Sequence, residues 1–131
     1  EAECQRYDKL LSSLTRDMQV LGLGLNGHIG FNEPSDEFAK GTNLIKLSES
    51  TIKANSRFFE KYEDTPTSAF TMGIQSIMQA RKILLLVSGK GKAQILREVI
   101  DGPIKPQVPA SILQLHKDVT IIADEDALSM L

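Results

Sequence analysis

The sequence predicts an α/β domain built on a largely parallel sheet. Strand-like segments alternate with helical segments along the chain, and the connections between them are short, which is typical of βαβ units. One apolar run, residues 82–88, is bounded by charged residues and glycine, and it indicates a strand covered on both faces. Four or five strands are expected, as in part of a doubly wound sheet, and 131 residues allow one domain at most.

The first half of the chain is expected to hold two helices and two strands. Apolar side chains recur at helical spacing in residues 4–14, and residues 19–23 form a short β-prone run next to a glycine. Residues 43–47 alternate polar and apolar side chains, as a half-exposed strand does. Ser48 then offers an N-cap hydroxyl, so we expect a helix through residues 51–59.

The second half continues the alternation of strands and helices. Residues 68–72 are expected to form a short strand, and residues 73–80 a helix with apolar side chains on one face. Another helix is expected after the apolar run, and the Gly-Pro pair at 102–103 ends it. Residues 119–123 have the pattern of a final strand. The acidic residues 124–126 that follow favour a short helix, because they lie at its positive end.

The composition points away from several classes of partner. The net charge is −2 with acids and bases interspersed, and tryptophan is absent, so we expect no nucleic-acid partner. No apolar run reaches the roughly 18 residues of a membrane span, and we expect no membrane partner. The single cysteine, Cys4, excludes an internal disulfide and fits a reducing compartment such as the cytoplasm.

The most informative segment is residues 24–34, Gly-Leu-Asn-Gly-His-Ile-Gly-Phe-Asn-Glu-Pro, which follows an apolar strand. Open α/β sheets bind their ligands in loops at the carboxyl ends of strands, and glycines there allow sharp turns. The imidazole of His28 titrates near neutral pH, and the carboxylate of Glu33 can fix its tautomer or relay its proton. A lone histidine more often satisfies a local hydrogen bond, so the spacing alone leaves both a catalytic and a structural role open.

Two basic residues are further candidates for a site. Lys92 lies in the first turn of a helix opened by Gly89 and Gly91, and such glycine-rich helix starts bind phosphate groups. A solvated lysine is the plain alternative, and the spacing is not that of a nucleotide-binding P-loop. Arg57 lies late in a helix beside two aromatic residues, where a surface arginine is the plain alternative. His116 is expected to be structural.

The pattern G-x-N-G-H-I-G-F-N-E-P resembles the signature of the glucosamine-6-phosphate deaminase (isomerase) family. Weaker matches follow in the family's order at residues 51–59, 66–73, 88–93 and 113–116. The resemblance implies a Rossmann-like, three-layer αβα fold and the conversion of glucosamine 6-phosphate and water to fructose 6-phosphate and ammonia. It also implies that the substrate is an amino-sugar phosphate and that neither a metal nor an organic cofactor takes part.

The resemblance also assigns roles to particular residues. His28 matches the ring-opening acid/base, which moves a proton between O1 and O5 of the sugar. Glu33 matches the carboxylate that orients and tunes this histidine. Asn26 occupies a position where some members carry Asp, so we expect the pKa of His28 to be raised less than beside an Asp. The residues matched to substrate binding, the first two through the phosphate, are Arg57, Lys92 and Gly27.

Two departures from the family's pattern lead to further expectations. The family's enolisation base, an Asp, and its Gly/Ser/Thr-rich phosphate loop lie in an N-terminal half that has no match here. We therefore expect residues 1–131 to be a single partial domain, the C-terminal half of the enzyme, which is inactive alone. Allosteric members bind N-acetylglucosamine 6-phosphate through basic residues after the signature. Asn43 and Ile45 stand at these positions, which predicts a non-allosteric enzyme.

Three other functions stay open on the sequence. A 6-phosphogluconolactonase shares the fold and a Gly-His loop, although its loop lacks the F-N-E-P sequence of residues 31–34. A galactosamine-6-phosphate isomerase acts on an epimer of the same sugar, and no residue here decides between the two. A sugar-phosphate-sensing domain of a transcriptional regulator needs phosphate binding but not the His28–Glu33 couple.

A half-sheet exposes apolar edges, so self-association is expected.

Overall fold

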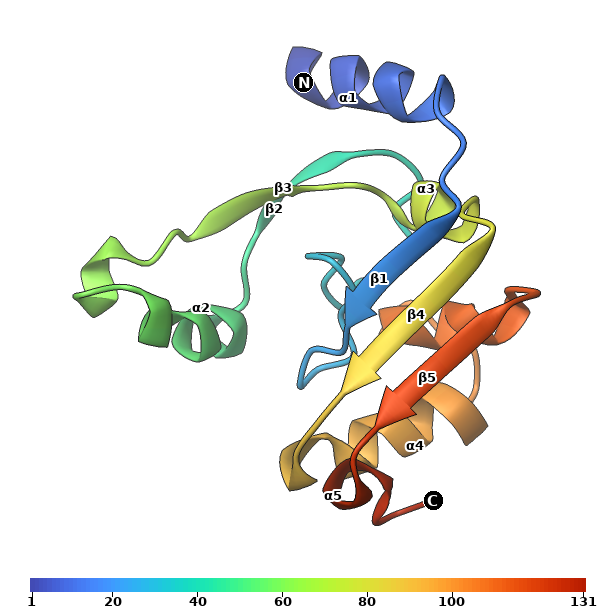
Figure 1. Ribbon diagram of the computed structural model, residues 1–131. Helices are drawn as coiled ribbons and strands as arrows, with labels where there is room; N and C mark the ends of the chain where they lie inside the picture. Colours follow the sequence, from blue (N-terminus) through green and yellow to red (C-terminus); the bar gives the residue numbers. More distant parts are fainter.

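The computed structural model describes residues 1–131 and has the mixed α/β character that the sequence predicts (Figure 1). The helices and strands are, in chain order, α1 (Ala2–Ser12), β1 (Met18–Gly22), β2 (Asn43–Lys46), α2 (Glu49–Asn55), β3 (Ser68–Thr71), α3 (Ile74–Met78), β4 (Lys82–Val87), α4 (Ala93–Asp101), β5 (Val119–Ala123) and α5 (Glu125–Leu128). The short 3-10 helices are η1 (Ser56–Phe58), η2 (Tyr62–Asp64), η3 (Lys90–Lys92) and η4 (Pro109–Leu115). None of the helices combines the length and the apolar character that crossing a membrane requires.

Three strands form the parallel sheet, in the order β1-β4-β5 (Figure 1). The register places Leu84 of β4 opposite Val20 of β1 on one side and Thr120 of β5 on the other. Because the strands are parallel, the loops that follow them all leave the sheet at the same edge. Open α/β sheets bind their ligands at this edge, where the carboxyl ends of the strands lie.

Two of the predicted strands do not join that sheet. Strands β2 and β3 pair with each other in antiparallel fashion, with Asn43 opposite Thr71, and α2 lies in the connection between them. We call residues 43–71 the arm, which reaches away from the parallel sheet in Figure 1. The prediction of a largely parallel sheet is confirmed by β1, β4 and β5, and it did not anticipate that β2 and β3 form a separate antiparallel pair. An alternating polar and apolar pattern indicates a half-exposed strand, but it does not indicate that strand's partner.

The hydrophobic core covers one face of the parallel sheet. In β4 the side chains of Ile83, Leu85 and Val87 point into it, at the period of two that a strand imposes. Leu96 of α4 and Leu113 of η4 pack against this face in the same cluster. The sheet and these helices make two packed layers. The loop after β1 is anchored on these layers.

The opposite face of the parallel sheet is open, contrary to the expectation for β4. Leu86 is 44% exposed, and on the same face Val20 of β1 and Ile122 of β5 are 53% and 57% exposed. A continuous apolar run shows that both faces of a strand are apolar, but not that the same chain supplies the layer covering each of them. Only one of the two helical layers of a three-layer αβα fold is therefore present in these residues.

Candidate active site

The loop after β1 is folded tightly on itself. The backbone N–H of Gly27 donates to the carbonyl of Gly24 at 3.0 Å, and that of Gly24 donates to the carbonyl of His28 at 2.9 Å. Gly27 and Gly30 have φ angles of +86° and +58°, a region that glycine enters without steric cost. The glycines therefore set the shape of the loop, as the sequence predicts.

The imidazole of His28 lies directly against the backbone of Gly24. A Cβ atom built on Gly24 would lie 2.2 Å from Nδ1 of the ring, so only glycine leaves room for it. The ring of Phe31 stacks on the imidazole, with 6.3 Å between the ring centroids and 29° between the planes. These contacts restrict the orientations that the His28 ring can adopt.

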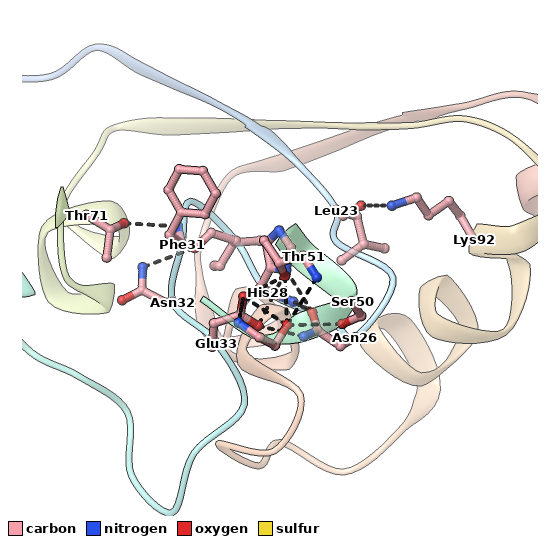
Figure 2. Close-up of polar contacts among 12 residues, drawn as sticks. Leu23, Asn26, His28, Phe31, Asn32, Glu33, Ser50, Thr51, Thr71 and Lys92 are labelled. Atoms are coloured by element: carbon pink, nitrogen blue, oxygen red, sulfur yellow. Dashed lines mark hydrogen bonds and ion pairs between the residues drawn. The ribbon is translucent and has the colours of Figure 1, made fainter. Parts of the chain in front are cut away.

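A chain of hydrogen bonds joins His28 to Glu33 through Asn26 (Figure 2). Nδ1 of His28 lies 2.7 Å from Oδ1 of Asn26, whose Nδ2 donates to Oε2 of Glu33 at 2.6 Å. The direct distance from His28 Nδ1 to Glu33 Oε2 is 3.8 Å. The structure thus brings together the three residues that the resemblance placed in ring opening, and it places the Asn26 amide between the other two.

The surroundings of His28 favour its neutral form. Burial lowers the pKa of His28 below its ordinary value, and the positive charge of Lys92 lowers it further, while the Glu33 carboxylate acts in the opposite direction. The sequence predicted a pKa that is merely less raised because Asn26 carries no charge. Desolvation by the surrounding loop, which no spacing reveals, turns the shift downward.

A cleft of about 980 Å³ opens beside the His28 ring. Its walls come from α1, β1, the loop after β1, the arm, α3 and η3. Of the six residues named for a site, four line this cleft: Asn26, His28, Arg57 and Lys92. No local pattern indicated that α1 reaches the same cleft through Arg6 and Tyr7, because that contact depends on the path of the chain between elements.

Two cations face the cleft without a carboxylate partner. The Nζ of Lys92 donates to the backbone carbonyl of Leu23 at the end of β1. Burial lowers the pKa of Lys92, and the charge of nearby Arg57 lowers it further. The guanidinium of Arg57 lies 4.8 Å from the centroid of the Phe58 ring. An Arg fork and a Lys beside one cleft suit the binding of a phosphate dianion, since such an anion relieves their mutual repulsion.

Gly27 takes a different place from the other predicted site residues. It is buried and does not line the cleft. A Cβ atom there would lie 2.9 Å from Cγ1 of Val108 and 3.3 Å from Cδ1 of Ile95, so the residue packs toward η4 and α4. Its part in shaping the loop is visible, and its contact with a substrate stays a prediction.

Two residues of the arm also hold Glu33 in place. The hydroxyl of Thr51 donates to Oε1 of Glu33 at 2.6 Å, and the hydroxyl of Ser48 lies 3.3 Å from the same oxygen. The sequence identified Ser48 only as an N-cap, which it is: its Oγ accepts from the backbone N–H of Thr51 at 3.3 Å. No local signal indicates the contact with Glu33, because 15 or more residues separate the partners.

The second histidine has a structural role. Nε2 of His116 lies 2.8 Å from the backbone carbonyl of Ala80, and its Nδ1 accepts from the N–H of Asp118 at 3.1 Å. Both ring nitrogens are therefore engaged in tying the end of η4 to the start of the neighbouring strands, as the sequence predicts. No group of three or more His, Cys, Asp or Glu side chains is placed to hold a metal ion.

The family model described as glucosamine-6-phosphate isomerases/6-phosphogluconolactonase matches residues 1–122. The chain belongs to this family. Among the relatives in it, a glucosamine-6-phosphate deaminase of Lachnoclostridium phytofermentans is 58% identical over 123 residues, which is 93% of this chain and 52% of that protein. A glucosamine-6-phosphate deaminase of Listeria monocytogenes is 55% identical over 131 residues, all of this chain and 56% of the relative.

Solved structures of family members have the same fold. A monomeric glucosamine-6-phosphate deaminase superposes with a TM-score of 0.95 at 48% identity, over 99% of this chain and 54% of that one. A 6-phosphogluconolactonase from Trypanosoma brucei superposes with a TM-score of 0.74 at 20% identity, which shows the shared fold alone. The chain spans about half the length of the curated relatives it matches.

Proposed function

We propose that this chain is the part of a glucosamine-6-phosphate deaminase that opens the sugar ring and holds the substrate phosphate. The observation that carries this proposal is the hydrogen-bonded set of His28, Asn26 and Glu33 beside a cleft that also holds Arg57 and Lys92. The 55–58% identity to glucosamine-6-phosphate deaminases supports the same function. The proposed reaction converts glucosamine 6-phosphate and water to fructose 6-phosphate and ammonia.

His28 is proposed to move the proton that opens the ring. Its pKa is lowered, so the imidazole is neutral near pH 7 and one ring nitrogen has a free lone pair. That nitrogen takes the proton of the O1 hydroxyl and returns it to the ring oxygen O5 as the C1–O5 bond breaks. The open-chain aldehyde results, and the imidazole ends as neutral as it began.

Arg57 and Lys92 are proposed to hold the phosphate. Both line the cleft, and each lowers the cost of placing a dianion there. The lowered pKa of Lys92 would rise once the dianion is bound, because an opposite charge favours the protonated amine. Phosphate binding therefore keeps Lys92 in its charged form.

The enolisation base is proposed to lie in the rest of the protein. The chain covers 52–56% of the length of its curated relatives. No Asp is among the residues that line the cleft. We propose that residues 1–131 form a single partial domain, and that this chain alone binds sugar phosphate without turning it over.

A cytoplasmic location follows from the proposed substrate, because cells keep sugar phosphates inside. Fractionation of cells with an antibody to the chain tests the location.

Release of ammonia from glucosamine 6-phosphate tests the function. We expect turnover by the full-length protein that carries this chain, loss of turnover in His28→Gln, and no turnover by residues 1–131 alone. His116→Gln is the matched control: it alters the other histidine, which lies outside the cleft, and it should retain turnover. A silent full-length protein that still binds the sugar phosphate would instead favour the sensing domain.

Two other substrates separate the remaining enzymatic functions. Galactosamine 6-phosphate, the epimer, should react more slowly than glucosamine 6-phosphate if the identity to deaminases extends to specificity. 6-Phosphogluconolactone should not be hydrolysed, because the structures named as 6-phosphogluconolactonases share only the fold at 13–21% identity. Addition of N-acetylglucosamine 6-phosphate should leave the rate unchanged, since Asn43 and Ile45 carry no charge for it. If either alternative substrate reacts faster than glucosamine 6-phosphate, that compound becomes the assigned substrate.

A further inference from the structure

The carboxylate of Glu33 receives hydrogen bonds from two directions. Asn26 Nδ2 donates to Oε2 at 2.6 Å, and Thr51 Oγ1 donates to Oε1 at the same distance (Figure 2). We propose that Thr51 is a positioning residue: by fixing the Glu33 carboxylate where it accepts from Asn26, it keeps the proton of His28 on Nδ1. The consequence for catalysis rests on the proposed function, whereas the hydrogen-bond chain itself does not.

The direction of each hydrogen bond follows from what the groups can donate. An ionised carboxylate only accepts, so Asn26 must turn its NH2 group toward Glu33 and its Oδ1 toward His28. Nδ1 of His28 lies 2.7 Å from that oxygen and must donate to it. The neutral ring then carries no proton on Nε2. That atom has no partner in the protein and is not among the buried unpaired atoms, so it is open to the cleft.

The same atoms have a second arrangement, of opposite polarity. If the Glu33 carboxylate turned away from Asn26, the amide could flip, and its Nδ2 would then donate to Nδ1 of His28. The neutral ring would carry its proton on Nε2, and it could not take a proton from a sugar hydroxyl. The two arrangements differ in whether the Glu33 carboxylate holds the NH2 group of Asn26, so a donor that fixes the position of that carboxylate selects between them.

Thr51 is placed to make that selection. Its side chain is buried, with 3% of the residue exposed, so water does not replace its hydroxyl. The hydroxyl of Ser48 donates to Oγ1 of Thr51 at 2.9 Å, which leaves the Thr51 proton for Glu33. The resulting charge-assisted hydrogen bond holds the carboxylate in the position from which it accepts from Asn26. Thr51 lies in α2, whose end leads into the η1 segment with Arg57, so the arm contributes both to the proposed phosphate site and to the tautomer of His28.

The test is the protonation of the His28 ring in the full-length protein, read from its 15N chemical shifts near neutral pH. We expect the Nδ1–H form in the wild type and a larger share of the Nε2–H form in Thr51→Val, which keeps the shape but removes the hydroxyl. Thr51→Ser should restore the wild-type shifts. With glucosamine 6-phosphate, kcat of Thr51→Val should fall about tenfold, the loss expected for one charge-assisted hydrogen bond, with little change in KM.

Thr65→Val is the matched control. Thr65 is as buried as Thr51, but its hydroxyl has no hydrogen-bond partner, so its loss removes a buried oxygen without reaching Glu33. We expect wild-type ring shifts and wild-type kcat for this variant. Equal changes in Thr65→Val and Thr51→Val would overturn the proposal, as would unchanged His28 shifts in Thr51→Val. If Thr51→Val does not fold, Thr51→Ala supplies the same two outcomes.

The spectroscopic result stands apart from the activity. A shifted His28 tautomer in Thr51→Val supports the positioning role even if the wild-type protein releases no ammonia, in which case only the proposed deaminase function fails. Unchanged ring shifts together with an active wild-type protein overturn the positioning role and leave the deaminase function intact.

Discussion

Asn26 connects His28 to Glu33 with one donor and one acceptor on the same amide. The substitution Asn26→Asp replaces that donor with a second carboxylate, 2.6 Å from the first. Like charges at this distance repel, and a protonated imidazole relieves the repulsion. We therefore expect the pKa of His28 to rise in Asn26→Asp, measured by NMR titration of the ring protons. His116, the second histidine, serves as internal reference. A His28 pKa at or below that of the wild type would contradict this account.

Gly24 is the residue whose lack of a side chain leaves room for the imidazole. In Gly24→Ala the new Cβ would meet the His28 ring at 2.2–2.5 Å, so the ring must move. A displacement of about 1 Å can cost a hundredfold in rate, and we expect kcat for ammonia release to fall by about that factor. Gly91→Ala is the control: it lies outside the cleft lining, the nearest atom to its new Cβ is Cδ2 of Leu25 at 3.8 Å, and the rate should hold. Equal rates in the two variants would show that the ring tolerates the shift.

His28 also gives the stability of the fold a pH dependence. Its folded pKa is lowered, so below its ordinary pKa of about 6.5 the unfolded chain binds the proton first. Stability is therefore lost as the pH falls from about 6.5 toward the folded pKa, by about 1.4 kcal/mol for each pH unit between the two values. Urea unfolding at a series of pH values measures this. His28→Gln should flatten the acidic side of the profile; an equally steep profile would assign the effect to other groups.

At the scale of elements, local sequence patterns predicted whether a segment is a helix or a strand better than they predicted which strands pair with each other. The helix α4 ends where the Gly-Pro pair at 102–103 predicts, and α5 begins at the Asp124 cap, whose side chain accepts from Ala127 at 2.8 Å. Such signals act over a few residues and are visible in the sequence. The pairing of β2 with β3 depends on contacts between segments some 25 residues apart, and an alternating pattern fits a strand in either sheet.

The two faces of β4 differ in what each side chain contributes. Leu85 is fully buried and Leu86 is 44% exposed, although the two are adjacent. Leu85→Ala should lower the free energy of unfolding by about 2–5 kcal/mol, because it leaves a cavity in the core. Leu86→Ala in the same chain should cost less than about 1 kcal/mol, since its side chain already contacts water. Urea unfolding of both variants decides, and equal losses would mean that the outer face is covered.

For the molecule as a whole, the open face of the sheet predicts how the chain behaves in isolation. Val20, Leu86 and Ile122 form exposed apolar surface over all three parallel strands. Residues 1–131 alone should therefore self-associate with rising concentration in sedimentation velocity. Leu86→Lys should weaken the association, whereas Leu115→Lys, at a leucine 66% exposed on η4, should not. A chain that stays monomeric at every concentration would exclude this face as a contact surface.

The candidate site was predictable from the sequence as far as its chemistry is local. Glycines, an amide, an imidazole and a carboxylate within residues 24–34 indicated where the site lies, and the structure brings Asn26, His28 and Glu33 into one hydrogen-bonded set. The anchoring of that set by Thr51 was not predictable, because it depends on how the arm folds back toward the loop. The downward direction of the His28 pKa shift depends in the same way on burial.

The Asn26–Gly27 pair is also a site at which the protein can deamidate spontaneously. An asparagine followed by glycine is prone to deamidation, because the unhindered glycine nitrogen can attack the side-chain carbonyl and expel its amide nitrogen. In the folded loop that nitrogen donates to Gly24 and the amide is held by Glu33, so the attack is restrained. Each opening of the loop removes the restraint. Deamidation at Asn26 therefore proceeds only from the fraction of molecules in which this loop is open, and it would replace the amide that joins His28 to Glu33 with a carboxylate.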